Sequence, residues 1–301
     1  MSERITEKIQ FLKQKRKAVI LAHNYQINDV QDVADYVGDS FGLSQQAART
    51  DADVIVFCGV HFMAESAYIL APGKTVLLPD KHAGCPLADT ICVEDLKKKK
   101  EQYPNAAVVC YVNSSAAVKA ESDVACTSSN AVKVVDSLDA EQILFVPDGN
   151  LAHWVAEQTI KEIIPWDGYC VTHQRVTIND VEQVRHAMPE AVITVHPECQ
   201  PDIVNLADFV GSTSAMLKFA RESEHENIIV GTEMGILHRM QKENPYKKFY
   251  LLSKGLICPN MKKISLEKVA LALETMEPKI TVPEDIRKKA ETVLERMLEV
   301  I

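Results

Sequence analysis

The chain repeats one pattern three times, and this repeat restricts its fold more than any other feature. Three β-branched runs begin apolar and turn polar at their carboxyl ends, as buried parallel strands do where they reach solvent. These runs are AVILAHNYQ (18–26), AAVVCYVNS (106–114) and AVITVHPEC (191–199). Each is followed by a Ser/Thr-rich segment that is typical of a capped helix start. These segments span 38–49, 126–135 and 211–221.

The spacing inside the repeat is constant. In each third, a polar residue at the end of the first run stands 17 positions before a Ser or Thr of the following segment. The pairs are His23 and Ser40, Tyr111 and Ser128, and His196 and Thr213. A second strand is predicted at 53–59, 142–149 and 227–235, and a third at 75–80, at 249–256 and, weakly, at 166–170.

Strand, helix, strand, helix, strand in each third predicts an α/β fold of three related small parallel-sheet αβα sandwich domains. We expect domains at 1–86, 87–170 and 171–258, with two helices in 259–301 packing back on the first. Ligands of open parallel sheets bind beyond the carboxyl ends of the strands. Three such domains about a pseudo-threefold axis would therefore enclose a central active-site cavity.

Composition excludes several classes of partner. The net charge of −9 argues against nucleic acid or an anionic membrane surface as the main partner. No apolar run approaches the ~20 residues of a membrane-spanning helix. The N-terminal segment is lysine-rich and amphipathic, unlike a signal peptide. We therefore expect a cytoplasmic protein with no membrane and no nucleic-acid partner.

One cysteine follows the third predicted strand of each third: Cys85, Cys170 and Cys258, separated by 85 and 88 residues. The cytoplasm keeps thiols reduced, and the chain has no Cys-x-x-Cys pair. Three thiolates fit a [4Fe-4S] cluster with one iron open to substrate, or a catalytic zinc, whereas structural zinc takes four ligands. They could also be ordinary buried thiols, but their equivalent positions favour a metal centre. We expect no ligand role for the other five cysteines.

Polar residues at the first-strand ends predict proton transfer and anion binding. They are His23, Tyr25, Tyr111, Asn113, His196 and Glu198. Ser40, Ser128 and Thr213 stand at expected helix N-termini, where free N–H groups favour anions. Each residue alone could be a satisfied strand-end group or a plain cap, but their repetition favours a shared site. Without a dinucleotide fingerprint or P-loop, a small, multiply anionic substrate is expected.

Eight short motifs resemble those of the quinolinate synthase family, the A protein of bacterial and archaeal NAD biosynthesis. They are HNYQ (23–26), GDS (38–40), GVHFMAE (59–65), GC-x-LAD (84–89), YVNSSAAVKA (111–120), HPEC (196–199), GST (211–213) and CPNM (258–261). The resemblance covers nearly the whole chain. It implies three αβα domains, a [4Fe-4S] cluster on Cys85, Cys170 and Cys258, and a transferase that condenses iminoaspartate with dihydroxyacetone phosphate. The products would be quinolinate, phosphate and two waters.

The resemblance also implies residue roles. Substrate contacts fall on His23, Ser40, Tyr111, Asn113, Ser128, His196, Glu198 and Thr213. Glu198 resembles the general base, with Tyr25, Tyr111 and His196 assisting catalysis. Some members carry Cys-x-x-Cys-x-x-Cys at the last ligand, where this chain has Leu252, Gly255 and Cys258. The family's substrates also imply transient contact with an aspartate-oxidising enzyme.

Two alternatives remain at this stage. An aconitase-like hydro-lyase also uses three cysteines and an open iron, but such enzymes commonly have a Cys-x-x-Cys pair, which is missing here. A redox-sensing or metal-storage module would hold a cluster without turnover. It would not need a tyrosine and a carboxylate at matching strand ends.

Overall fold

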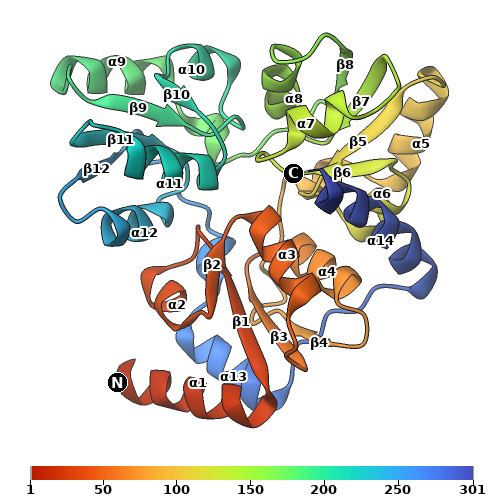
Figure 1. Cartoon of the computed structure of the whole chain (residues 1–301), viewed down its shortest axis with the longest axis vertical. Helices are drawn as coiled ribbons and strands as arrows, with labels where there is room; N and C mark the ends of the chain where they lie inside the picture. Colours follow the sequence, from red (N-terminus) through yellow and green to blue (C-terminus); the bar gives the residue numbers. More distant parts are fainter. Residues whose placement is uncertain (1, 301) are drawn as a thin grey trace.

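The computed structural model describes residues 2–300 and contains three four-stranded sheets, each entirely parallel (Figure 1). The first sheet has the order β2-β1-β3-β4, and the other two repeat that order. Its strands are β1 (Ala18–His23), β2 (Tyr36–Gly38), β3 (Val54–Cys58) and β4 (Thr75–Leu77). The second sheet contains β5 (Ala107–Tyr111), β6 (Val124–Cys126), β7 (Gln142–Val146) and β8 (Glu162–Pro165). The third contains β9 (Val192–Val195), β10 (Phe209–Val210), β11 (Asn227–Gly231) and β12 (Lys248–Leu251). The predicted α/β class is confirmed.

The helices repeat in the same order around each sheet (Figure 1). The first third has α1 (Ser2–Arg16), α2 (Asn28–Val33), α3 (Ser40–Arg49) and α4 (His61–Leu70). The second has α5 (Val93–Gln102), α6 (Ala116–Ala120), α7 (Ala131–Asp136) and α8 (Gly149–Ala156). The third has α9 (Ile178–Ala187), α10 (Pro201–Asn205), α11 (Thr213–Glu222) and α12 (Ile236–Glu243). Within residues 2–300, no helix combines the length and the apolar character needed to cross a membrane.

A short edge strand completes each sheet, and the sequence predicted none of the three. An aspartate just before each edge strand accepts a hydrogen bond from a backbone N–H 15 residues earlier and donates its own N–H back to that residue. The pairs are Asp35 with Ile20, Asp123 with Val108, and Asp208 with Ile193, at 2.8, 2.7 and 2.7 Å to the carboxylate. The repeat therefore extends to individual hydrogen bonds.

The strand predicted at 166–170 is wrong. The strand is β8, Glu162–Pro165, and residues 166–170 form the turn that leads to Cys170. A Cβ on Gly168 would lie 2.3 Å from the carbonyl oxygen of Pro147, and the Gly168 carbonyl accepts a hydrogen bond from Gly149 at 2.7 Å. This close approach of two backbones leaves room only for glycine at position 168, and the strand ends before it, at Pro165.

The terminal segment connects two of the sheets. Helix α13 (Leu266–Thr275) packs on α1 and β3, as expected for the first third. Helix α14 (Glu284–Glu299) packs mainly on α6 and β6 of the second third and also on α4 (Figure 1). One hydrophobic cluster runs through the first sheet, part of the second and both terminal helices, whereas the third sheet has separate clusters.

Candidate active site

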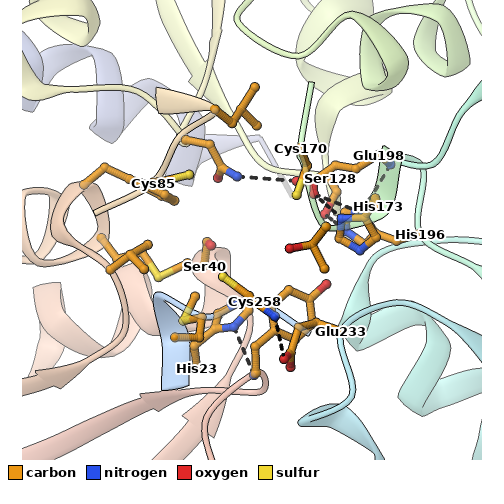
Figure 2. Close-up of a pocket in the computed structure, with 18 of the residues that line it drawn as sticks. His23, Ser40, Cys85, Ser128, Cys170, His173, His196, Glu198, Glu233 and Cys258 are labelled. Atoms are coloured by element: carbon orange, nitrogen blue, oxygen red, sulfur yellow. Dashed lines mark hydrogen bonds and ion pairs between the residues drawn. The ribbon is translucent and has the colours of Figure 1, made fainter. Parts of the chain in front are cut away.

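The polar ends of the three sheets line one cavity of about 770 Å³, which includes space open to solvent (Figure 2). Every site residue predicted from the sequence lines it. The first third contributes His23, Tyr25, Ser40 and Cys85, the second Tyr111, Asn113, Ser128 and Cys170, and the third His196, Glu198, Thr213 and Cys258. Residues far apart in the chain are thus brought to one place.

The same local structure surrounds each predicted ligand cysteine. A 3₁₀ turn begins three residues after Cys85, Cys170 and Cys258. These turns are η1 (Ala88–Thr90), η2 (His173–Arg175) and η3 (Met261–Lys263). Burial raises the pKa of all three thiols, that of Cys85 to about 12. Backbone N–H groups at the start of each turn donate towards the sulfur and lower the thiol pKa in part. Donors of this kind stabilise thiolates in iron–sulfur sites.

The three thiols come from three parts of the chain and do not form one close group. They stand on different walls of the cavity (Figure 2), and none of the cysteines in the described chain is in a disulfide. Burial raises the pKa of Cys85 and Cys170 most, and the charge of Glu198 raises both further. A cube binds each thiolate through a different iron, so its ligands are spread wider than those of one ion.

A second possible metal set shares one of these thiols. Within residues 2–300, Cys170, His173 and Glu198 form the only group of three or more His, Cys, Asp or Glu residues whose ligand atoms all lie within 4.8 Å of one another. Sulfur, nitrogen and carboxylate ligands of this kind suit zinc. His173 and Glu198 already contact each other at 2.7 Å, however, so their closeness has an explanation without a metal.

Glu198 is a buried carboxylate whose partners come from the second and the third repeat of the chain. Its Oε1 accepts hydrogen bonds from the Tyr111 hydroxyl at 2.5 Å and from Asn113 Nδ2 at 3.4 Å. Its Oε2 lies 2.7 Å from His173 Nδ1 and 3.9 Å from His196 Nδ1. Burial raises the pKa of Glu198, but the two histidines and Tyr111 outweigh burial and hold that pKa below its usual value. Glu198 is therefore ionised near neutral pH and can accept a proton.

His173 and Thr232 connect Glu198 to Tyr25. His173 Nε2 lies 2.8 Å from Thr232 Oγ1, which lies 2.5 Å from the Tyr25 hydroxyl. The contact of His173 Nδ1 with Glu198 is short but lacks hydrogen-bond alignment, so a small ring rotation would complete a path between the two tyrosines. Burial, followed by the charge of Glu198, raises the pKa of both Tyr25 and Tyr111, which therefore stay protonated.

Neither His173 nor Thr232 was predicted from the sequence as a site residue. His173 stands three positions after Cys170, where the other repeats have Ala88 and Met261. A comparison of the three repeats would have marked it as the polar exception. Thr232 directly follows β11, but no spacing pattern distinguishes it.

Two buried histidines line the cavity as neutral rings. Burial lowers the pKa of His23 to about 4 and that of His196 to about 3. His196 stacks on His173 with centroids 5.0 Å apart, and its Nε2 lies 3.1 Å from Ser128 Oγ. A neutral imidazole presents one donor and one acceptor, so these residues can orient a substrate without adding charge.

Ser40 and Thr213 begin helices as predicted, whereas Ser128 does not. Ser40 is the first residue of α3 after the cap Asp39, and Thr213 is the first of α11 after the cap Ser212. Helix α7 begins only at Ala131. The Asn130 side chain accepts hydrogen bonds from the N–H and hydroxyl of Thr127 and holds 127–130 in a separate turn.

Asp39 ties the three Ser/Thr turns together. Its Oδ1 accepts from the N–H of Gly42, and its Oδ2 accepts from the hydroxyls of Ser129 and Ser214, each at 2.7 Å. Asn24 Nδ2 also donates to Thr213 Oγ1 at 2.9 Å. One carboxylate therefore joins the first third to the other two beside the cavity.

Comparison with known proteins agrees with this arrangement. The family described as Quinolinate synthetase A protein matches residues 7–299. The quinolinate synthase of Alkaliphilus metalliredigens is 59% identical over 98% of this chain and 97% of that protein. Quinolinate synthases of Clostridium kluyveri and Methanosarcina barkeri are 56% and 54% identical, covering 98% of this chain and 98% and 97% of those proteins. The resemblance seen in the sequence is confirmed, and the chain belongs to the Quinolinate synthetase A protein family.

Proposed function

We propose that this chain condenses iminoaspartate with dihydroxyacetone phosphate to give quinolinate, phosphate and two waters. The observation that carries the proposal is the single cavity in which three thiols, an ionised Glu198 and two protonated tyrosines meet. The reaction involves no net oxidation. It needs acid–base chemistry and protection from water, and both suit a largely buried cavity.

Cys85, Cys170 and Cys258 would hold a [4Fe-4S] cluster. When bound, it supplies an iron without a protein ligand, which acts as a Lewis acid towards a substrate oxygen. The half-buried thiols and the N–H donors of their 3₁₀ turns support this assignment.

Anionic substrate groups would bind at the Ser/Thr turns. The hydroxyls of Ser40, Ser128 and Thr213 line the cavity, and two of them begin ten-residue helices whose first N–H groups favour anions. Asn113 adds a carbonyl oxygen, buried and without a partner in the described chain, that can accept from a substrate N–H or O–H. His23 and His196 orient the substrates as neutral rings.

Proton transfers would centre on Glu198. Closing the ring and losing two waters moves protons from carbon and nitrogen to departing hydroxyl groups. Glu198 takes up a proton as general base, and the protonated hydroxyls of Tyr111 and Tyr25 supply protons to oxygen. His173 and Thr232 lie between Glu198 and Tyr25 and would return protons from one to the other.

The setting of the reaction is also part of the proposal. Eight free cysteines suit the reducing cytoplasm. Imines hydrolyse in water, so transient contact with an aspartate-oxidising enzyme would protect iminoaspartate on its way to the cavity. We also retain 1–86, 87–170 and 171–258 as the three domains.

The test is an assay on anaerobically prepared protein. Iminoaspartate and dihydroxyacetone phosphate are supplied, and quinolinate and phosphate are measured. The proposal predicts equal amounts of both products, and a Glu198→Gln variant that has lost most activity. Hydration of a small hydroxy acid without quinolinate would instead identify a hydro-lyase, and a cluster without turnover of either substrate would identify a sensing or storage module.

A further inference from the structure

A buried ion pair joins the third sheet to the turn that follows Cys258. Glu233, just beyond β11, is fully buried, and Lys262 lies in η3 with little exposure. The Lys262 Nζ atom lies 2.9 Å from Oε1 and 3.0 Å from Oε2 of Glu233. The same carboxylate accepts from the backbone N–H of Cys258 at 3.1 Å and of Gly235 at 2.7 Å. Glu233 thus holds the backbone of a predicted cluster ligand.

The same lysine reaches the loop that carries Tyr25. Lys262 Nζ donates to the Tyr25 carbonyl oxygen at 2.6 Å. That loop also packs closely against Gly235, because a Cβ at this position would lie 2.6 Å from the Tyr25 carbonyl carbon. The buried Gln31 side chain donates to the carbonyls of Gly235 and Gln26 at 2.8 and 2.9 Å. Backbone from the first and third parts of the chain is therefore closely packed here.

The hydrogen-bonding capacity of this pair is directed at protein. The Lys262 ammonium donates hydrogen bonds to Glu233 Oε2 and to the Tyr25 carbonyl, and it lies within ion-pair distance of Glu233 Oε1. Glu233 Oε2 accepts from Lys262 and from the N–H of Gly235, and Oε1 accepts from the N–H of Cys258. Glu233 also lines the cavity, but the contacts of both side chains are with protein groups, and together they contact the backbones of Tyr25 and Cys258.

We propose that Glu233 and Lys262 are positioning residues: by holding the backbones of Tyr25 and Cys258, they fix the position of the Tyr25 hydroxyl relative to the metal ligand Cys258. The inference rests on the proposed function, which gives Tyr25 and Cys258 their roles. A shift of about 1 Å in a catalytic group can cost about 100-fold in rate. Loosening the pair should therefore reduce turnover through Tyr25 while leaving the Ser/Thr turns able to bind substrate.

The first experiment is a double-mutant cycle in the cluster-containing enzyme. Lys262→Met should lower kcat by roughly 10- to 100-fold while KM changes by less than about threefold. If Lys262 acts through Tyr25, the Tyr25→Phe/Lys262→Met variant should be no slower than Tyr25→Phe alone. Losses that multiply, or a Lys262→Met enzyme with normal kcat, would overturn the proposal.

The second experiment does not depend on activity. In cluster-free protein, hydrogen exchange of the amides in 24–31 should become faster in Lys262→Met. The matched control is Arg185→Met, which also removes a cation from a carboxylate that holds a backbone N–H in the third sheet, 2.8 Å from Asp208 and away from the cavity. That variant should leave exchange in 24–31 and kcat unchanged, and equal effects of the two variants would contradict the proposal.

A third variant separates positioning from folding. Removing Lys262 alone leaves the Glu233 charge buried and unpaired, which can destabilise the fold strongly. Glu233→Gln/Lys262→Met removes both charges, so it should fold but still exchange quickly in 24–31 and turn over slowly. Wild-type exchange and kcat in this variant would overturn the inference. Faster exchange in a chain whose wild type makes no quinolinate would reject the proposed function and retain the link between Lys262 and the Tyr25 loop.

Discussion

The ionised state of Glu198 results from its neighbours. Burial alone would favour the protonated acid, but His196, His173 and the Tyr111 hydroxyl hold the pKa of Glu198 below its usual value. The sequence predicted Glu198, Tyr111 and His196 because each stands at a strand end. It did not predict His173, because this residue lies in the 3₁₀ turn after Cys170 rather than at a strand end, and its contact with Glu198 forms only when the third part of the chain folds.

The hydrogen bond from Tyr111 to Glu198 gives the first prediction. Tyr111→Phe removes the 2.5 Å bond and the proton that Tyr111 would donate. We expect kcat for quinolinate formation to fall by roughly 100-fold or more, the usual contribution of a general acid or base. Tyr246→Phe, at a tyrosine that is 94% exposed, is the control and should be fully active. A fully active Tyr111→Phe enzyme would remove Tyr111 from the mechanism.

The neutral histidines give a prediction about pH and stability. The folded-state pKa values of His23 and His196, about 4 and about 3, lie below the ordinary value of 6.5. As pH falls below 6.5, the unfolded chain takes up protons that the folded chain does not, so stability is lost from about pH 6.5 down to about pH 4 for His23 and about pH 3 for His196. Each histidine should destabilise the protein by up to roughly 2 kcal/mol between about pH 7 and about pH 5.

Urea unfolding of cluster-free protein at the two pH values measures this effect. The His23→Gln/His196→Gln variant should lose less stability on acidification than the wild type. An equal loss in both proteins would show that other groups control the acid sensitivity.

At the level of elements, the repeat explains why the sheets could be predicted and their edges could not. The central strands are continuous apolar runs that are buried on both faces, and these runs are visible in the sequence. The edge strands β2, β6 and β10 have only two or three residues, too few for an apolar pattern to show, and each is joined to the central strand by an aspartate hydrogen bond. The turn at Gly168 is set by a backbone approach from Pro147, which no local sequence signal reveals.

Asp39, which joins turns from all three repeats, gives a prediction about stability and substrate binding. Asp39→Ala removes the cap of α3 and the acceptor of two serine hydroxyls from the other thirds. We expect a loss of roughly 2–4 kcal/mol in the free energy of unfolding and a higher KM, because the anion-binding turns lose their alignment.

Thr177→Ala is the control for this change, because Thr177 caps α9, a helix none of whose residues lines the cavity. It should cost about 1 kcal/mol and leave KM unchanged. If Asp39→Ala changed stability without changing KM, Asp39 would be a cap and nothing more.

For the whole molecule, the main result is that three distant cysteines reach one cavity. Their equal place in each repeat predicted this, because equivalent loops of three related sheets can meet at a centre. We expected both terminal helices to pack on the first third, but α14 packs mainly on α6 and β6 of the second, because an amphipathic helix pattern identifies a buried face but not the sheet that covers it. The hydrophobic cluster shared by the first and second thirds includes residues of that helix.

The metal content of cysteine variants tests the central claim most directly. Iron, sulfide and zinc are measured in anaerobically prepared wild type, Cys85→Ala, Cys258→Ala and, as control, Cys92→Ala, which changes an exposed thiol outside the cavity. A cluster shared by three thiols predicts about four irons and four sulfides per chain in the wild type and control, and loss of most of both in the other two variants. A single zinc that Cys85→Ala and Cys258→Ala both retain would contradict it, and would place the metal at Cys170, His173 and Glu198 instead.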